Sequence, residues 1–350
     1  MRRPGFPKLH VFTAMKKGTV NIRLAIYALA LAGASLLTFL LVRHGIGDVA
    51  SAVAAARWGV LAVVVFHLVP LFGDTLSWWV LFPGKYRVPL PVAFRMRWIG
   101  ESVSNLVPTS AVGGEIVRTR VAALNGAPLG IAAATVLGDV TLGICVQTVF
   151  TLTGVGLLIV ETGRTNILVP ALAGVPLAML AVAGFYAAQR IGIFKILSGL
   201  VGRFSKDPSW QSVLAKGGGI DEAIREVYAR RRAVAACCVF TMGSWLCSSV
   251  EVWIALRAVG VQAGFDKAII LESICQGVRA AMFFIPGGLG VQEGGYMVVG
   301  GFLGIPADMA LAISLIRRAR ELAIGVPGLL AWQFSEGHRL WRNRVLQAAE

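Results

Sequence analysis

The stretch that decides the fold is Pro108-Thr-Ser-Ala-Val-Gly-Gly-Glu115, because a related stretch, Pro286-Gly-Gly-Leu-Gly-Val-Gln-Glu293, follows 178 positions later. After each glutamate come twelve residues and then another proline, Pro128 or Pro306. Two prolines and a glutamate at one spacing indicate an internal duplication, and the alternative is an ordinary Pro-Gly turn between unrelated helices. The other identities at this offset pair Val121 with Val299, Gly126 with Gly304, Ala132 with Ala310, Ala134 with Ala312 and Leu137 with Leu315.

The composition is that of a membrane protein. Of the 350 residues 56% are hydrophobic and 15% are charged, with a mean hydropathy of +0.73, whereas soluble domains are about 25% charged. The net charge of +15 lies mostly in loops and tails, where positive-inside bias and anionic lipid explain it. We therefore predict an all-α polytopic membrane protein whose partners are membrane lipids, and no nucleic-acid binding.

About six membrane spans and two re-entrant hairpins are predicted. A full crossing needs about 20 mostly apolar residues, and the segments on either side of each Gly-rich stretch are too short or too polar for that. We predict that they form half-helix hairpins around 108–114 and 286–290. The predicted spans are 24–42, 58–82, 128–160, 167–188, 233–256 and 308–334.

The distribution of basic residues predicts the orientation. Only five of the 33 Lys and Arg (Arg43, Arg57, Arg164, Arg257 and Lys267) fall in the predicted outer loops, which places both termini in the cytoplasm. Three spans separate the hairpins, so the repeat is predicted to be inverted. The predicted organisation is a basic cytoplasmic segment 1–23, a single transmembrane domain 24–334 and a cytoplasmic tail 335–350. Within the domain lie repeat 1 (about 58–160), a cytoplasmic insert (190–232) and repeat 2 (about 233–334).

Glu115 and Glu293 are predicted to stand at the starts of half-helices, directly after the glycines. A helix N-terminus favours a carboxylate, and it equally favours a lipid phosphate. Each glutamate therefore either stabilises its own helix or takes part in gating, pairing or proton exchange near a headgroup.

Asp139 and Arg317 are equivalent in the duplication, and we predict that they pair or face one cavity. An unpaired charge at mid-bilayer costs about 2.5–3.5 kcal/mol even on lenient scales. Arg317 and Glu321 are four residues apart and are expected to pair within their helix. These charges form either a structural ion network or a groove whose arginines hold a phosphate or another polar head. The predicted substrate-binding residues are Glu101, Asn105, Gly113, Gly114, Glu115, Arg118, Asp139, Arg279, Gly288, Gly290, Gln292, Glu293, Arg317, Arg318 and Glu321.

No catalytic constellation is evident. The chain has no Ser/His/Asp set and no metal-ligand spacing, its five cysteines lie in apolar stretches, and His67 is interpreted as a core residue. We expect no catalytic residue, no metal site and no cofactor. A membrane transferase that uses carboxylates stays open as an alternative.

Four stretches resemble the lysylphosphatidylglycerol synthase transmembrane-region family, also called flippase-like. They are Glu101-Ser-Val-Ser-Asn-Leu-Val-Pro108, Val112-Gly-Gly-Glu-Ile-Val-Arg118, Pro286-Gly-Gly-Leu-Gly-Val-Gln-Glu-Gly-Gly295 and Ser314-Leu-Ile-Arg-Arg-Ala-Arg-Glu321. The resemblance covers about residues 24–337 and is nearest to members associated with hopanoid biosynthesis. It implies a multi-pass bacterial inner-membrane protein with re-entrant helices and lipid translocation. Bifunctional relatives add an aminoacyl-transferase domain that these 350 residues lack, so we expect no aminoacylation.

Three functions are compatible with these observations. The first is a lipid transporter or flippase that moves a polar-headed lipid or hopanoid across the inner membrane. The second is a membrane enzyme or accessory factor of hopanoid or isoprenoid lipid synthesis. The third is a secondary transporter for a small solute; the possibility of a homo-oligomer is also open.

Overall fold

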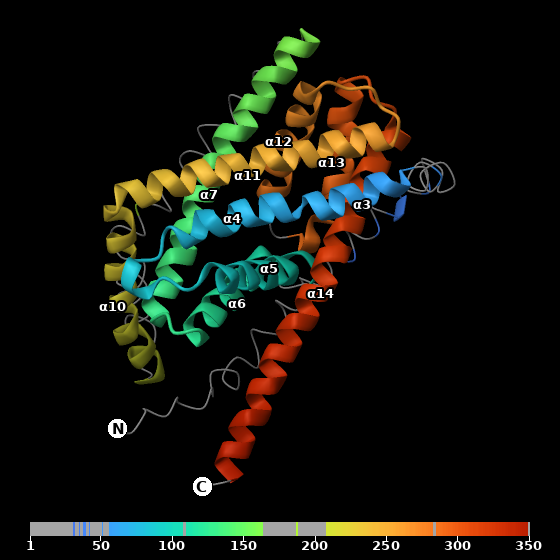
Figure 1. The fold of residues 1–350 in the computed structure, drawn as a ribbon. Coiled ribbons are helices and arrows are strands. Elements are labelled where there is room, and N and C mark those ends of the chain that lie inside the picture. The colour runs from blue at the N-terminus through green and yellow to red at the C-terminus, as the bar shows by residue number, and fades with distance from the viewer. Residues whose placement is uncertain are drawn as a thin grey trace.

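The computed structural model describes residues 56–107, 110–163, 208–282 and 285–348, with isolated positions at 31, 35, 38, 39, 42, 51 and 187. Over these residues the chain is helical and has no strand, as predicted. The predicted spans 24–42 and 167–188 lie almost wholly outside the described residues. The elements are α3 (Arg57–Phe66), α4 (Leu68–Trp79), η2 (Gly84–Tyr86), α5 (Leu90–Leu106), α6 (Ser110–Leu124), α7 (Leu129–Thr162), α10 (Pro208–Ala229), α11 (Arg231–Ala258), α12 (Phe265–Ala281), η4 (Pro286–Gly288), α13 (Val291–Phe302) and α14 (Ala307–Ala348) (Figure 1).

Among the residues that the structure describes, three helical stretches are long and apolar enough to cross a membrane. They are Trp58–Trp79, which combines α3 and α4, Leu129–Thr162 and Arg231–Ala258, and they coincide with three of the six predicted spans. The chain is therefore an all-helical membrane protein. The predicted span 308–334 lies within α14 but carries several charges and is not one of the three, so the full topology stays a prediction.

The helix boundaries repeat at the offset seen in the sequence. α6 ends at Leu124 and α13 at Phe302, while α7 begins at Leu129 and α14 at Ala307; both pairs are 178 residues apart. The connecting loops also share their hydrogen bonds. Matching backbone N–H to carbonyl bonds are Asn125–Val121 with Leu303–Val299, Asn125–Ala122 with Leu303–Gly300, Gly126–Ala123 with Gly304–Gly301, Ala127–Ala122 with Ile305–Gly300 and Ala132–Pro128 with Ala310–Pro306.

Glycine is required in both loops for the same reason. Gly126 has a φ of 102° and Gly304 a φ of 74°, a region that L-residues with a side chain rarely adopt. Each follows the end of a helix, α6 or α13, and Pro128 or Pro306 precedes the next long helix, where its fixed φ suits a helix start. The duplication is thus confirmed by backbone geometry.

The two repeats pack reciprocally. α4 lies against α11, its equivalent in the other repeat, while α7 packs on α12 and α14 packs on α5. α7 and α14 are equivalent, as are α5 and α12, so the same contact is made twice with the repeats exchanged. Equivalent helices run in opposite directions, as Figure 1 shows for α3–α4 against α11 and for α7 against α14. Equivalent helices are therefore antiparallel in the structure, and the inversion of the repeats across the membrane stays a prediction.

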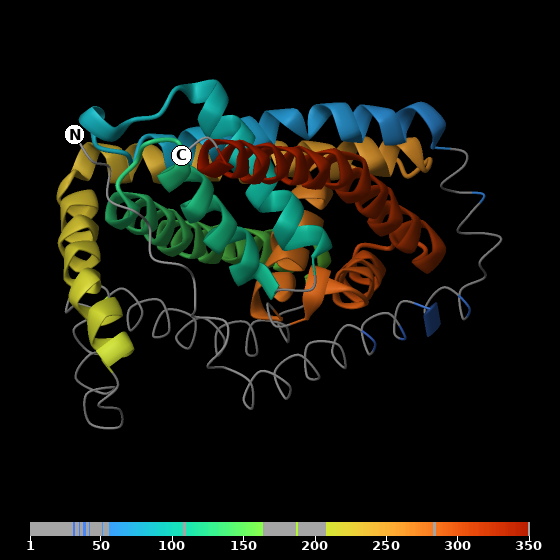
Figure 2. The same cartoon turned by 90° about the horizontal axis from the view of Figure 1, so that it is seen from below.

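Part of the predicted insert is a helix that packs on the bundle. α10 stands at one end, against α7, as Figure 2 shows. Ala223, Ile224 and Val227 are buried in the apolar cluster of repeat 1. Arg230, which follows α10, donates hydrogen bonds to the carbonyls of Leu81 (2.8 Å) and Val80 (3.2 Å). It thereby satisfies carbonyls at the C-terminal end of α4, where a cation is favoured.

Candidate functional site

A cavity of about 430 Å³ lies where the two repeats meet, a size typical of ligand pockets. Its lining comes from α4, α5, α6 and α7 of the first repeat and from α11, α12, η4 and α14 of the second. Ten of the fifteen predicted site residues line it: Glu101, Asn105, Gly114, Glu115, Arg118, Asp139, Arg279, Gly288, Arg317 and Glu321. The other five, Gly113, Gly290, Gln292, Glu293 and Arg318, are not lining residues.

Asp139 is held by residues of its own repeat. Its Oδ2 lies 2.7 Å from Arg97 Nη1 and 2.8 Å from Arg118 Nη1, and its Oδ1 accepts a hydrogen bond from Ser77 at 3.1 Å. Arg118 is 2% exposed and also pairs with Glu115, at 2.6 Å. Asp139 therefore does not pair with Arg317, which corrects the first form of that prediction. The second form holds, because both residues line one cavity.

Arg317 pairs with Glu272 of α12. Its two terminal nitrogens lie 2.5 Å and 3.0 Å from the carboxylate oxygens, and Tyr296 donates to the same carboxylate at 3.3 Å. Glu272 is fully buried and Arg317 is 2% exposed. The predicted pair between Arg317 and Glu321 is therefore wrong, because Arg317 turns towards α12.

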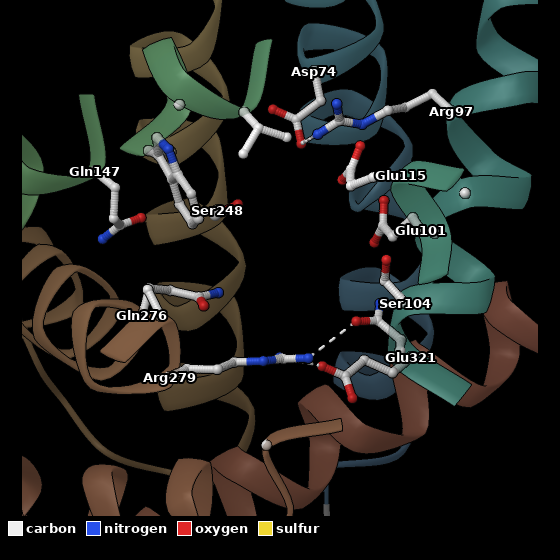
Figure 3. A pocket seen from close by; sticks show the side chains of 18 of the residues that line it. Asp74, Arg97, Glu101, Ser104, Glu115, Gln147, Ser248, Gln276, Arg279 and Glu321 are labelled. Carbon is white, nitrogen blue, oxygen red and sulfur yellow. Dashed lines mark hydrogen bonds and ion pairs between the residues drawn. The ribbon is translucent and has the colours of Figure 1, made fainter. Parts of the chain in front are cut away.

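Glu321 accepts from two other arginines. It lies 2.7 Å from Arg279 Nη1 and 2.8 Å from Arg318 Nη1. Arg279 also donates to Asn105 of α5 at 3.0 Å, so it joins the second repeat to the first. Figure 3 shows Arg279 reaching across the cavity to Glu321.

His67 occupies the break between α3 and α4. Its Nδ1 lies 2.8 Å from Glu251 and its Nε2 lies 3.0 Å from Glu101. Arg320 Nη1 is 2.8 Å and 3.0 Å from the two ring nitrogens. The imidazole thus connects α5, α11 and α14. His67 is buried and both ring nitrogens have partners, as expected of a core residue, and it also lines the cavity, which the sequence did not predict.

The first Gly-rich stretch is a helix rather than a turn. α6 begins at Ser110, so Gly113 and Gly114 are helical and Glu115 lies beyond the first turn, which corrects its predicted place at a helix start. A side chain at Gly114 would overlap Ser104 and the carbonyl of Gly100. Glycine is therefore needed here for the close approach of α5 and α6.

The second Gly-rich stretch is a true turn. Gly287, Gly288 and Gly290 all have positive φ, and Arg318 donates to the carbonyls of Gly287 (2.6 Å) and Gly288 (3.0 Å). Glu293 stands in the first turn of α13, as predicted. It is fully buried and accepts from Arg318 Nε at 2.8 Å. Glu293 and Arg318 thus stabilise the turn, although neither side chain lines the cavity.

The cavity has an acidic wall and a neutral wall. Asp74, Glu101 and Glu115 keep 29%, 22% and 35% of their side chains exposed, and Figure 3 shows them along one side. Gln147 and Gln276, with Ser248, face them from the other side. None of these neutral residues, nor Asp74 and Arg97, was among the predicted site residues. One signal in the sequence could have identified most of them, because an ionisable or amide residue inside an apolar span is a functional candidate.

In the part of the chain that the structure describes, no group of His, Cys, Asp and Glu is arranged to hold a metal ion. The charged residues instead bind one another. Such networks hold polar groups inside a membrane domain because unpaired charge there is costly.

The sequence matches the family model for the lysylphosphatidylglycerol synthase TM region over residues 23–328. A comparison with curated proteins finds no significant match. The match covers every residue that lines the cavity. The chain therefore belongs to the lysylphosphatidylglycerol synthase TM region family.

Proposed function

We propose that this protein moves a polar-headed lipid or hopanoid across the bacterial inner membrane, with both termini in the cytoplasm. The observation that carries the proposal is the polar cavity at the junction of the two repeats in an otherwise apolar bundle. A family associated with lipid modification or transport supports a lipid as the substrate.

The reciprocal packing offers a route for alternating access. The contact of α7 with α12 is repeated by the contact of α14 with α5. A state with the first contact closed and the second open is therefore equivalent to a state with the second closed and the first open. Transporters with inverted repeats use such exchanges around a site at the repeat interface. The hydrogen bond from Trp98 Nε1 to the carbonyl of Ile324 (2.8 Å) and the Arg279–Asn105 contact join the repeats in the present state.

The outer surface suits contact with lipid tails. Large apolar side chains are exposed on helices of both repeats, among them Trp58 (80%), Val239 (70%) and Phe334 (74%). Large exposed apolar patches mark interaction or membrane surfaces. A lipid whose head occupies the cavity can keep its tails on this surface.

The charge balance constrains how an anionic head would bind. The ion network that surrounds the cavity in the described residues holds six arginines (Arg97, Arg118, Arg279, Arg317, Arg318 and Arg320) and eight carboxylates (Asp74, Glu101, Glu115, Asp139, Glu251, Glu272, Glu293 and Glu321). Each of these arginines already faces a carboxylate. A phosphate head would have to displace internal carboxylates, so arginine alone is a poor basis for recognition.

The test is a reconstituted translocation assay. Purified protein in liposomes is expected to move fluorescent phospholipids or a labelled hopanoid between leaflets. Asp139→Asn removes the charge that holds Arg97 and Arg118 and is expected to reduce the rate at least about tenfold, as loss of a buried ion pair suggests. Glu161→Gln is the matched control, because Glu161 lies on the same helix and its side chain is exposed, while that of its partner Lys267 is half-buried.

Three outcomes separate the alternatives. Lipid movement that Asp139→Asn abolishes and Glu161→Gln preserves supports translocation. Uptake of a small solute without lipid movement favours a secondary transporter. Product formation from a lipid precursor, without movement of lipid between leaflets, favours the membrane enzyme.

A further inference from the structure

We infer that the neutral wall of the cavity binds the hydroxyl groups of an uncharged, polyol-like or sugar-like headgroup, through Gln147 of α7 and Trp245 of α11. The inference rests on the proposed function only in taking the ligand to be a lipid. The site can be tested by binding alone.

Gln147 presents a fixed acceptor. It is 8% exposed, and its Nε2 donates to Thr151 Oγ1 at 3.0 Å, which in turn donates to the carbonyl of Ser273 at 3.0 Å. This chain of bonds orients the amide and leaves Oε1 buried without a hydrogen-bond partner among the described residues. Figure 3 shows the Gln147 side chain pointing into the cavity.

Trp245 presents a fixed donor. Its ring stacks on Phe150, with centroids 6.0 Å apart and planes at 24°, and Phe150 is 1% exposed. Its Nε1 is buried and meets no hydrogen-bond acceptor among the residues that the structure describes, although Trp245 lines the cavity. Phe150 is three residues after Gln147 and so lies on the same face of α7, which brings the indole and the amide to one region of the wall.

A buried donor and a buried acceptor select for a hydroxyl group. A hydroxyl accepts from an indole N–H and donates to an amide oxygen, whereas an ammonium only donates and an ionised phosphate oxygen only accepts. Leaving both atoms unpaired is costly, and a flat ring beside polar groups suits a ligand with an apolar face and a polar edge. The ion network also contains buried donors without a hydrogen-bond partner among the described residues, Arg118 Nε and Arg320 Nε. These belong to guanidinium groups that already face carboxylates, so they do not offer a neutral donor like the indole N–H.

The experiment measures binding to the full chain in phosphatidylcholine nanodiscs. The probes are radiolabelled monoglucosyl diacylglycerol and phosphatidic acid with the same acyl chains. Binding is measured at alkaline pH, where the phosphate monoester is fully ionised and therefore only accepts hydrogen bonds. Trp245→Phe keeps the stacked ring and removes only the N–H; we expect it to weaken the glucolipid about threefold to tenfold, with less than about a twofold change for phosphatidic acid. Gln147→Leu removes the acceptor and is expected to act alike.

Trp253→Phe is the matched control. Trp253 lies two turns further along α11, donates to the carbonyl of Ala263 at 3.2 Å and does not line the cavity. It is expected to leave both affinities unchanged. Unchanged glucolipid binding in Trp245→Phe and Gln147→Leu, or an equal loss for both probes, means that water satisfies the two atoms and overturns the inference.

Two further measurements distinguish a free sugar from a lipid headgroup as the ligand, and the binding site from the translocation proposal. Competition by soluble methyl glucoside that Trp245→Phe weakens upholds the site and identifies a free sugar or polyol as its ligand. Glucolipid binding without any lipid movement upholds the site and overturns the translocation proposal. Lipid movement with no preference for the glucolipid over phosphatidic acid upholds the translocation proposal and overturns the inference about the site.

Discussion

The two hairpins share one sequence phrase and use it differently. In the first, the glycines lie inside α6 and allow it to approach α5 closely. In the second, they form a left-handed turn before α13, and Arg318 satisfies two of its carbonyls. The loops that follow are nevertheless the same, hydrogen bond for hydrogen bond. A duplicated segment has therefore kept its helix ends while its turn has diverged, and the divergence faces the cavity.

The largest effect is expected from changing Arg317. It tests which side chains pair with Asp139 and Arg317, the equivalent residues of the two repeats. Arg317→Glu places a second carboxylate beside Glu272, both buried, and should cost about 3–5 kcal/mol of stability or prevent folding. The swap Glu272→Arg with Arg317→Glu should restore part of the folded yield and of the melting temperature in detergent. The swap Asp139→Arg with Arg317→Asp should restore neither, because these side chains pair within separate repeats. Rescue by the second swap alone would contradict the contacts described above.

The same substitution at equivalent positions should separate the hairpins. Glu293 is fully buried beside Arg318, so Glu293→Gln is expected to lower stability by about 3 kcal/mol. Glu115 keeps 35% of its side chain exposed, so Glu115→Gln should cost less than about 1 kcal/mol. Chemical denaturation in detergent micelles measures both. Equal losses would mean that the two glutamates have the same role.

Adding a methyl group should distinguish a helical glycine that close packing requires from one that lies in open space. Gly114→Ala meets Ser104 and the Gly100 carbonyl and should destabilise by about 1–3 kcal/mol through overpacking. Gly294→Ala in α13 meets nothing within 4 Å and should be neutral or stabilise by up to about 1 kcal/mol. Thermal unfolding of the two variants compares them directly, and a destabilised Gly294→Ala would reverse the interpretation of α13.

The smallest effect should be the same in both repeats. Gly126→Ala and Gly304→Ala each add a Cβ where no atom lies within 4 Å, so only the positive φ opposes them. Each should cost about 1 kcal/mol. Helical Gly243, also in open space, provides the control substitution to alanine. A clear difference between Gly126→Ala and Gly304→Ala in melting temperature would show that the two loops are not equivalent.

The candidate site was predictable where a charge or a glycine stands out against an apolar background. Asp139 and Arg317 could be assigned to one cavity because the duplication relates them, but the choice of ion-pair partners could not. Several carboxylates and arginines lie within reach of one another, and small differences in helix rotation decide which of them meet. Gln147 was overlooked, because an amide inside an apolar span marks a candidate residue but does not show whether its side chain faces a cavity or the core.

By itself the sequence determined the helical membrane class, the duplication and the places where α6 and α13 end, because these depend on hydropathy, proline and glycine over short distances. Only the tertiary structure decided that Gly113 and Gly114 are helical while Gly287 and Gly288 form a turn. Glycine tolerates both conformations, and the choice depends on what lies opposite: Gly100 and Ser104 for α6, Arg318 for the turn before α13. The neutral wall is likewise a tertiary result, since Gln147 and Trp245 come from different repeats and line one cavity because α7 packs against α11.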